Sequence, residues 1–391
     1  MRSKAKQQKK IKGECSNEDT CVFSYDIIVN ILIKVYAVSL LRFKCVSKSW
    51  NNMISEDVTF TKAHCEQSKI IRREKLLLQR KSGGFDFIHL NNFNEVVIDK
   101  QQFPLKGFLG AHVLCSYDGL VLLKKSKAYK QFVLWNPLFG QHQIFECPYM
   151  KSHEHTFSSA YGLCYDSITD DYKFVLIHNL FYVVYSMSKN IWTKKISLPT
   201  LQQFSHSYVW SKEISTKNHV YWSLNEKFLC HKYKTSTFIY FDAELDELKE
   251  LPIPIAASEH QCLFQLSTWK GCLSAYGCNN SYSGFHIWIR QHDDWKWLMS
   301  IPNIPALNYG CYFYNYKILC CTENDELIFQ GPQCHNLSIY CLKQQRFIRR
   351  VNIPNHLEYL LGHAMSICLD SLYFPKFNVT RKRKQLSTPS K

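Results

Sequence analysis

Residues 239–254 read IYFDAELDELKELPIP, which is an apolar run, a polar turn, a second run and a proline stop. The same order returns in LWNPLFGQHQIFECP from Leu134, VYSMSKNIWTKKISLP from Val184, IWIRQHDDWKWLMSIP from Ile287 and IYCLKQQRFIRRVNIP from Ile339. The closing prolines are 51, 55, 48 and 52 residues apart, at Pro148, Pro199, Pro254, Pro302 and Pro354. A repeat of about fifty residues with several strands per unit indicates a β-propeller.

The material between these repeats predicts further strands, so five units are complete. Asp118-Gly119 between apolar runs, for example, is a hairpin signal. Both ends of the repeating region resemble halves of one more blade: KLLLQRK, FDFIHL and EVVIDKQQFP at the start and HAMSICLDSLYFP at the finish. We expect the C-terminal strand to pair with the N-terminal ones and close the ring, which hides sheet edges. This predicts six blades; seven blades and an open pair of β-sandwiches are the alternatives.

Ahead of the repeats, residues 24–60 read SYDIIVNILIKVYAVSLLRFKCVSKSWNNMISEDVTF. One apolar stripe at helical spacing begins this segment, and Asp26 lies in its first turn, where a carboxylate favours the positive helix end. Ser39 is a candidate N-cap for a second helix. Two or three short helices cannot bury all this apolar surface alone, so a partner should cover part of it. The stripe and the following apolar set are Ile27, Ile28, Ile31, Leu32, Leu40, Leu41, Phe43, Val46 and Trp50.

Composition predicts a folded, soluble intracellular protein. The chain has 391 residues, 46% of them hydrophobic, with no run of twenty apolar residues and no signal-peptide pattern behind the basic N-terminus. Its 17 cysteines are scattered without a C-x-x-C pair, so we expect reduced thiols and no zinc. Cys320 and Cys321 should point to opposite faces of one strand.

The positive charge is concentrated at the two ends of the chain. The net charge is +16, but residues 1–12 carry six cations and residues 381–391 carry five, which leaves about +5 for the long middle. We expect disordered basic tails over 1–20 and 376–391. The sharper alternative is a nuclear import signal in either tail. Because the excess lies in the tails, we expect no nucleic-acid partner, and no membrane partner.

At SLLRFKCVSKSWNNMIS the segment resembles an F-box, the module that docks on the Skp adaptor of cullin-based ubiquitin ligases. The matching positions are Ser39, Leu41, Arg42, Val46, Ser47, Lys48, Trp50, Ile54 and Ser55. The resemblance implies that adaptor contacts, or the small core behind them, come from Asp26, Ile27, Ile28, Ile31, Leu32, Leu40, Leu41, Arg42, Val46 and Trp50. Typical members open both of their first two helices with Leu-Pro, whereas this chain has Phe23-Ser24 and Val35-Tyr36. We therefore expect looser helix starts and weaker adaptor binding.

The long C-terminal part resembles the F-box-associated domain of large plant families. The similar features are the pattern GLCYDSITDDYKFV from Gly162 to Val175, Asp118-Gly119-Leu120, Trp135-Asn136-Pro137 and Ile191-Trp192. Structural roles are also open to these residues: Asp166, Asp170 and Asp171 fit a turn, and Trp135 and Trp192 fit packing between blades. The expected organisation is therefore α+β: an all-α F-box of about three helices over 21–65, followed by an all-β propeller over 70–375.

The resemblance implies a substrate-receptor subunit of a Skp-cullin-F-box ubiquitin ligase, in the cytoplasm or nucleus, whose propeller holds a target protein. The alternatives are a scaffold whose degenerate F-box no longer recruits the ligase, and an enzyme using the central pocket. No catalytic, cofactor or metal site is predicted, because His153 and His155 flank Glu154 without metalloprotease spacing, and His292-Asp293-Asp294 fits a hairpin tip. The loops proposed for target contact are 151–157, 202–211 and 278–284; no target-contact residue is predicted.

Overall fold

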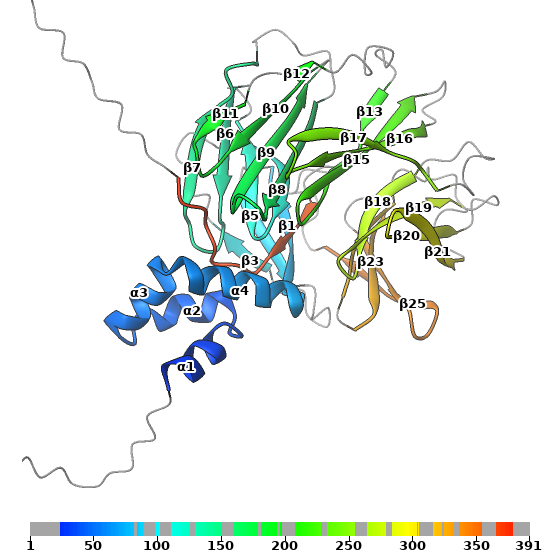
Figure 1. The fold of residues 1–391 in the computed structure, drawn as a ribbon. Coiled ribbons are helices and arrows are strands. Elements are labelled where there is room, and N and C mark those ends of the chain that lie inside the picture. The colour runs from blue at the N-terminus through cyan, green and yellow to red at the C-terminus, as the bar shows by residue number, and fades with distance from the viewer. Residues whose placement is uncertain are drawn as a thin grey trace, which may run out of the picture.

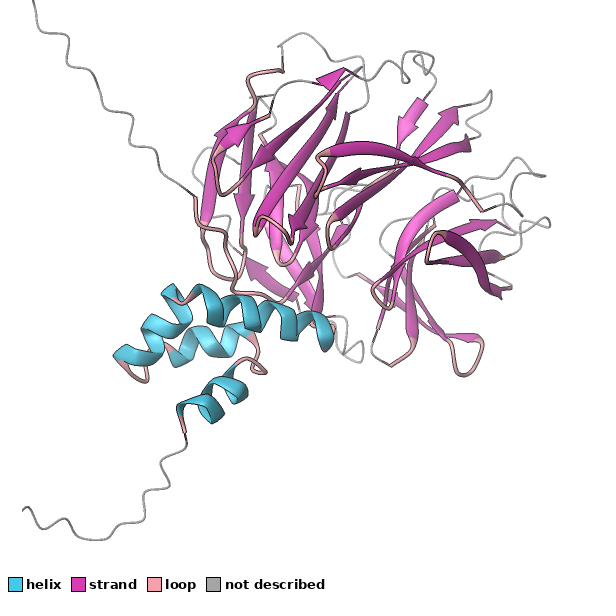
Figure 2. Ribbon diagram, viewed as in Figure 1, coloured by secondary structure: helices cyan, strands magenta, loops and turns pink. Residues whose placement is uncertain are grey.

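The structure, a computed structural model, separates a small helical unit from a large unit of strands (Figures 1 and 2). It describes residues 24–377 except 82–83, 90–97, 102–110, 126–129, 151–158, 179–180, 194–195, 198–207, 228–232, 255–263, 279–283, 303, 305–315, 323, 332–335 and 354–364. The strands form six antiparallel sheets arranged as the blades of a propeller. The predicted fold class and the count of six blades are confirmed.

Each blade contains four strands in a meander, and two blades carry one short extra strand. Blade 1 contains β26 (Met365–Leu369), β1 (Glu74–Gln79), β2 (Phe85–His89) and β3 (Ile98–Gln101); blade 2 contains β4 (His112–Tyr117), β5 (Leu120–Lys124), β6 (Gln131–Trp135) and β7 (His142–Glu146). Blade 3 contains β8 (Ser159–Asp166), β9 (Asp171–His178), β10 (Phe181–Ser186), β11 (Ile191–Trp192) and β12 (Ile196–Ser197). Blade 4 contains β13 (Tyr208–Trp210), β14 (Ile214–Thr216), β15 (His219–Lys227), β16 (Tyr233–Asp242) and β17 (Glu247–Leu251). Blade 5 contains β18 (Phe264–Trp269), β19 (Cys272–Cys278), β20 (Phe285–Gln291) and β21 (Asp294–Ile301), and blade 6 contains β22 (Lys317–Cys321), β23 (Glu326–Gln330), β24 (Asn336–Cys341) and β25 (Arg346–Asn352).

Blade 1 closes the ring with strands from both ends of the chain. The C-terminal strand β26 lies at the inner edge of the blade and pairs antiparallel with β1, in a register that places Leu76 opposite Ile367. It also contacts β4 of blade 2 and β22 of blade 6, so the first and last blades meet through it. The expected closure is confirmed, and it leaves no open end at which the ring could add further blades.

Apolar side chains on both faces of the blades hold neighbouring blades together. Trp135 of blade 2 packs against Phe85 of blade 1, with ring centroids 5.2 Å apart, inside a cluster shared by those two blades. Trp192 of blade 3 donates its indole N–H to the Glu146 carbonyl of blade 2 at 2.7 Å. Both tryptophans therefore pack between blades, as predicted.

The cysteines and the hairpin turns also agree with the sequence. Cys320 and Cys321 lie in different clusters, on opposite faces of β22, and both are free thiols. In the β8–β9 turn, Asp166 Oδ1 accepts the Ile168 N–H at 2.9 Å. The exposed pair His292-Asp293 forms the tip of the β20–β21 hairpin.

The helical unit contains four helices where the sequence pattern predicts about three. They are α1 (Tyr25–Leu32), α2 (Ala37–Phe43), α3 (Lys48–Glu56) and α4 (Val58–Ile70). The prediction of Ser39 as an N-cap is wrong, because Ser39 lies inside α2. Two helices are capped by the residue directly before them: Ser47 accepts from Trp50 N–H at the start of α3, and Asp57 accepts from Thr59 and Phe60 N–H at the start of α4. The apolar set that was expected in one helix is therefore split by the Ser47 cap, with part of it in α2 and part in α3.

Several sequence predictions fall outside the described residues. They concern the tails over 1–20 and 378–391, the loop 151–157 with its two histidines, and most of 202–211 and 278–284. Helix α4 contacts Asp170 in the β8–β9 turn, at one end of the blades. The strand ends that the loops join, such as Glu146 and Ser159, lie at the opposite end. No helix within the described residues is long and apolar enough to cross a membrane.

The contact between blades 3 and 4 gives a test of this packing. A Cβ on Gly162 would lie 2.5 Å from Val220 Cγ1 and 2.8 Å from Trp222 Cζ2. We expect Gly162→Ala to lower the free energy of unfolding by about 1–3 kcal/mol, because this interface has no room for a methyl group. Chemical denaturation measures it. Gly331→Ala is the matched control, since its nearest neighbour would be 3.6 Å away; equal stability of the two variants would contradict the packing.

Candidate adaptor-binding surface and its attachment to the propeller

The structure divides the predicted adaptor-binding residues into a core and a surface. Leu32 and Leu40 are fully buried with Met53, Ile54 and Phe60 in the core of the helical unit. Ile28, Leu41 and Trp50 are half-buried and pack against that core. The residues that face outward are Asp26, Ile27, Ile31, Arg42 and Val46.

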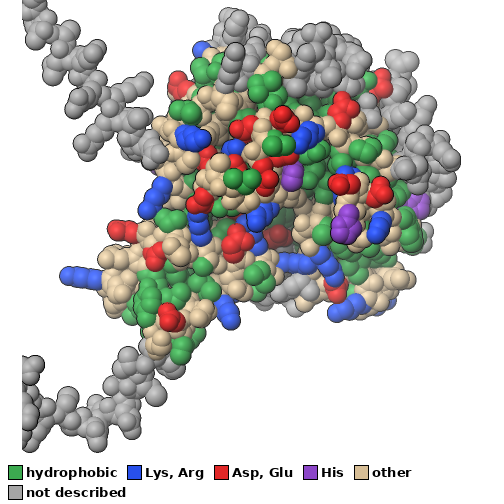
Figure 3. All heavy atoms as spheres, in the orientation of Figure 1, with side chains coloured by type: hydrophobic (Ala, Val, Ile, Leu, Met, Phe, Trp, Pro, Cys, Tyr) green, Lys and Arg blue, Asp and Glu red, His purple; other side chains and the backbone are tan. Residues whose placement is uncertain are grey.

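The outward set includes an apolar surface that the described residues leave exposed. Ile27 and Ile31 lie four residues apart on α1, and their exposed fractions are 47% and 54%. Tyr25 and Val46 are exposed as well, and Figure 3 shows hydrophobic side chains gathered on the helical unit. Exposed apolar side chains in one small region mark interaction sites, because burying them against a partner is favourable.

The starts of α1 and α2 are the positions at which the sequence lacks proline. Ser24 precedes α1 and Tyr36 precedes α2, and neither side chain bonds a helix N–H. Each of these helices therefore begins without a cap from its own flanking residue.

A residue from the far end of the chain supplies the missing cap of α2. Asp370, directly after β26, accepts the Ala37 N–H at 2.9 Å and lies 3.1 Å from Lys75 Nζ. Asp370 is fully buried and Lys75 nearly so. A negative charge at a helix start is stabilising, and the lysine compensates the buried carboxylate. The ring-closing strand and the helical unit are thus joined through one side chain.

Helix α4 attaches the helical unit to the propeller through two carboxylates. Lys62 Nζ lies 2.6 Å from Asp170 Oδ2 in the β8–β9 turn. Lys69 Nζ lies 2.8 Å from Asp118 Oδ2, which also accepts the Tyr172 hydroxyl hydrogen at 2.8 Å. Burial raises the pKa of Asp118, and the adjacent Lys69 ammonium opposes this rise. The aspartates of two family-like patterns therefore orient α4 on the ring.

The Trp135-Asn136-Pro137 turn fixes the chain after β26. Asn136 is fully buried, and its amide nitrogen donates to the carbonyls of Ser371 and Tyr373, each at 2.9 Å. Its side-chain oxygen accepts the N–H groups of Leu138 and Phe139, each at 2.9 Å. The side chains that this turn and the C-terminal segment place against the helical core are Leu138, Phe139 and Leu372.

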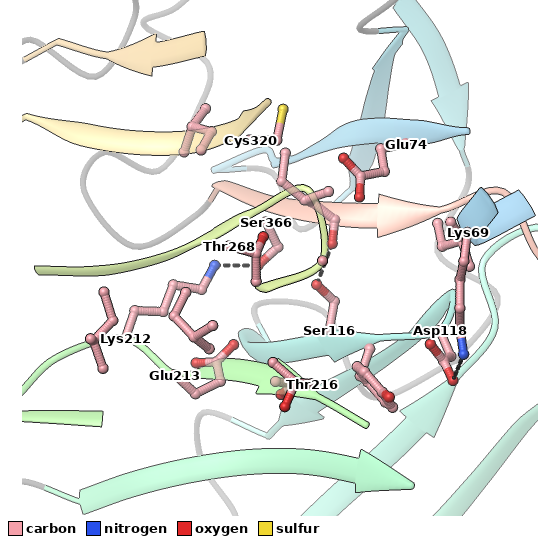
Figure 4. Close-up of a pocket in the computed structure, with 18 of the residues that line it drawn as sticks. Lys69, Glu74, Ser116, Asp118, Lys212, Glu213, Thr216, Thr268, Cys320 and Ser366 are labelled. Carbon is pink, nitrogen blue, oxygen red and sulfur yellow. Dashed lines mark hydrogen bonds and ion pairs between the residues drawn. The ribbon is translucent and has the colours of Figure 1, made fainter. Parts of the chain in front are cut away.

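A chamber of about 1260 Å³ lies among the inner strands and beneath α4 (Figure 4). Lys212 reaches from blade 4 to blade 1, where its ammonium donates to Ser366 Oγ at 2.6 Å. Burial raises the pKa of the neighbouring Glu213 to about 7. Among the described residues, no group of three or more His, Cys, Asp or Glu side chains could hold a metal ion. Polar and apolar side chains line the chamber together.

A comparison with protein families matches residues 89–377 to the F-box associated beta propeller domain. The chain belongs to this family.

Three F-box proteins of one plant are similar to this chain over most of their length. The F-box/kelch-repeat protein At3g23880 of Arabidopsis thaliana is 27% identical over 301 residues, which cover 71% of this chain and 79% of that protein. The putative F-box protein At3g25460 of the same plant is 26% identical over 86% of this chain and 89% of its own. The putative F-box protein At3g17500 is 24% identical over 92% of this chain and 96% of its own, so that alignment extends into the helices before the propeller.

The sequence did not reveal which residues attach the F-box-associated propeller to the helices. The sequence predicts that the aspartate patterns form turns, which is confirmed, but Asp118 and Asp170 also hold α4. Asp370 and Ala37 are 333 residues apart, so no local pattern could connect them. The one sequence feature that pointed to an unusual contact at the start of α2 was Tyr36, which stands where typical F-boxes have proline.

The joint between helices and propeller should weaken in acid because of His64. This fully buried side chain of α4 donates through Nε2 to the Val35 carbonyl at 2.9 Å, while Nδ1 has no hydrogen-bond partner. Burial lowers the pKa of His64, with Asp370 opposing the shift and Arg73 reinforcing it. The unfolded chain therefore binds a proton more readily, and stability is lost as the pH falls through about 6.5, the pKa of an unperturbed histidine.

We expect the urea midpoint of the wild-type chain to fall more between pH 7.5 and pH 5.5 than that of His64→Gln. The variant removes this titration and keeps a side-chain donor, so it separates His64 from the other histidines. Equal falls in the two proteins would show that His64 does not contribute to the acid sensitivity.

Proposed function

We propose that this chain is a substrate-receptor subunit of a Skp-cullin-F-box ubiquitin ligase. The observation that carries the proposal is the exposed apolar surface of the helical unit, with Ile27 and Ile31 at its centre, ahead of an F-box-associated propeller. The Skp-type adaptor would cover this surface and connect the chain to the cullin. The cytoplasm or nucleus would be the site of action, and the chain itself would make or break no bond.

The mechanism would be proximity. A target held by the propeller near a charged conjugating enzyme reacts at a high effective concentration, as if the two were one molecule. The function of the propeller is then to hold the target at a fixed orientation. The contacts of Lys62 and Lys69 with the ring support this, because they attach α4 to the blades at two separate points.

The face of the ring opposite α4 is the better candidate for target binding. Helix α4 lies over the β4–β5 and β8–β9 turns and covers the chamber from that side. The loops proposed for target contact join strand ends on the other face. We retain residues 21–65 and 70–375 as the proposed limits of the two units, with α4 contacting both.

A scaffold that no longer recruits the ligase is the second candidate. The observation that favours it is the lack of a side-chain cap at the start of α1 and of a local cap at the start of α2. If those starts are too loose, the adaptor surface forms at a free-energy cost that weakens binding. An adaptor-binding measurement separates the two functions.

We expect Ile27→Asp/Ile31→Asp to lose at least about tenfold in affinity for a purified Skp-type adaptor, because two charges would enter an apolar contact. Both side chains are exposed, so the urea midpoint should hardly change. The matched control is Ile168→Asp, on a propeller turn, where the side chain is 71% exposed. Calorimetric titration measures affinity, and wild-type affinity in the double variant would contradict the assignment; no binding by the wild type would favour the scaffold.

Restoring proline at the first helix start should strengthen adaptor binding. Ser24 has φ −53° and ψ 143°, values that proline adopts. We expect Ser24→Pro to raise the free energy of unfolding by about 0.4–1 kcal/mol by restricting the unfolded chain, and to raise adaptor affinity.

Ser39→Pro is the matched control for this substitution, because Ser39 N–H bonds the Tyr36 carbonyl at 2.9 Å inside α2. It should destabilise the helix by about 3 kcal/mol and weaken adaptor binding. Weaker binding by Ser24→Pro, measured in the same titration, would show that the missing proline is not the limitation.

A further inference from the structure

The outer strand of blade 6 and the turn before it carry a run of positive charge without an acid. Removing the eleven tail cations from the net charge of +16 leaves +5, and the eight residues KQQRFIRR, 343–350, carry four cations and no acid. They form the β24–β25 turn and most of β25. We call the four cations the basic edge: Lys343, Arg346, Arg349 and Arg350.

Two cations of the basic edge, Lys343 and Arg346, have different kinds of partner from the cations near α4. Lys62, Lys69 and Lys75 each contact an aspartate of the propeller at 3.1 Å or less. In the basic edge, Lys343 Nζ lies 3.8 Å from Asp325 Oδ2, and Arg346 Nε donates to the exposed Gln344 amide oxygen at 2.9 Å. All four side chains are exposed, so their charge is presented to solvent.

Within the part of the chain that the structure describes, strand β25 lies at the edge of the blade 6 sheet and pairs with β24. Figure 1 shows it away from α1–α3. Arg349 lies opposite Ile339 and Arg350 opposite Ser338, so the two arginines project to opposite faces of the sheet. An added strand would therefore meet positive charge on both of its faces.

We propose that β25 is a docking edge for an acidic, extended segment of a partner protein, which adds to blade 6 as a further strand. The backbone groups of the edge supply strand-pairing hydrogen bonds, and the basic edge selects acidic side chains. The exposed Ile348 offers an apolar contact between the charges. This deepens the target-receptor function, and it needs no contact with the F-box.

Protection of the edge from aggregation does not account for four charges of one sign. The outer strand β17 of blade 4 has the sequence ELKEL, in which glutamates and a lysine are mixed. A mixed edge is already protected, because any charge disfavours pairing with another apolar strand. A uniform positive edge adds selectivity for an acidic partner.

A protein segment fits this edge better than a nucleic acid. Single-stranded nucleic acids bind where bases can stack on exposed aromatic rings. Phe347, the aromatic residue of β25, instead packs on Phe329 and Tyr340, with ring centroids 5.6 and 5.1 Å away. The Phe347 ring therefore packs within the blade and offers no stacking surface for a base.

The test uses the purified full-length chain and a fluorescent peptide of about ten residues with alternating Glu and Val. We expect the Glu peptide to bind at least about tenfold more tightly than a Gln-Val peptide, with affinity falling as salt rises. A Glu-Val peptide with N-methylated backbone amides should lose binding, because it cannot pair with β25. Equal affinity for the Glu and Gln peptides, or unchanged binding of the N-methylated peptide, would overturn the proposal.

Variants locate the site. Arg346→Glu/Arg350→Glu should reduce Glu-Val affinity at least about tenfold, while Lys81→Glu/Lys189→Glu, which makes the same charge change at two exposed lysines elsewhere, should bind as the wild type does. Glutamates still protect the edge, so both proteins should remain folded, which circular dichroism checks. Equal losses in both variants, or tighter binding of a single-stranded DNA of about ten nucleotides than of the Glu-Val peptide, would also overturn the proposal.

No adaptor is present in these measurements. Failure of the basic edge is therefore distinguishable from failure of the adaptor-binding surface.

Discussion

The contact of Asp370 with α2 and with Lys75 is the interaction on which the arrangement of the two units depends. It joins the start of an F-box helix, the first strand of blade 1 and the end of the ring-closing strand. A carboxylate this deeply buried is costly unless it is paired, and removing one partner of such a pair typically costs about 3–5 kcal/mol. The helical unit and the closed ring therefore stabilise each other, and their relative orientation follows from the same contact.

The attachment has consequences for how a receptor of this kind could present a target. Asn136, Asp118 and Asp170 hold the chain after β26 and α4 against the ring through direct hydrogen bonds. Each lies in a turn at the same end of a blade, so the F-box is fixed at that end and the other face is left for a partner. The outer edge of blade 6 is a separate surface and would bind its partner from the side.

Much of the fold could be predicted from the sequence because its signals are local. The spacing of prolines, the Asp-Gly and Asp-rich turns and the strand halves at both ends predicted six blades and their closure. The helix boundaries are predicted less well: the sequence pattern indicates Ser39 as a cap, whereas Ser47 and Asp57 cap α3 and α4. The division of the apolar helical residues into core and surface could not be predicted from the helical segment alone. Leu372 and Phe139 complete that core, and both lie far from the helices in the sequence.

Ring closure by β26 also affects the order of events during protein synthesis. The strand and Asp370 follow every other described strand in the sequence, so α2 can receive its cap only after the strands of all six blades have been synthesised. A chain that terminates early lacks this cap, the contact of Leu372 with the helical core and the strand that joins blades 1 and 6. In such a fragment the helical unit would remain incomplete, with part of its apolar core uncovered.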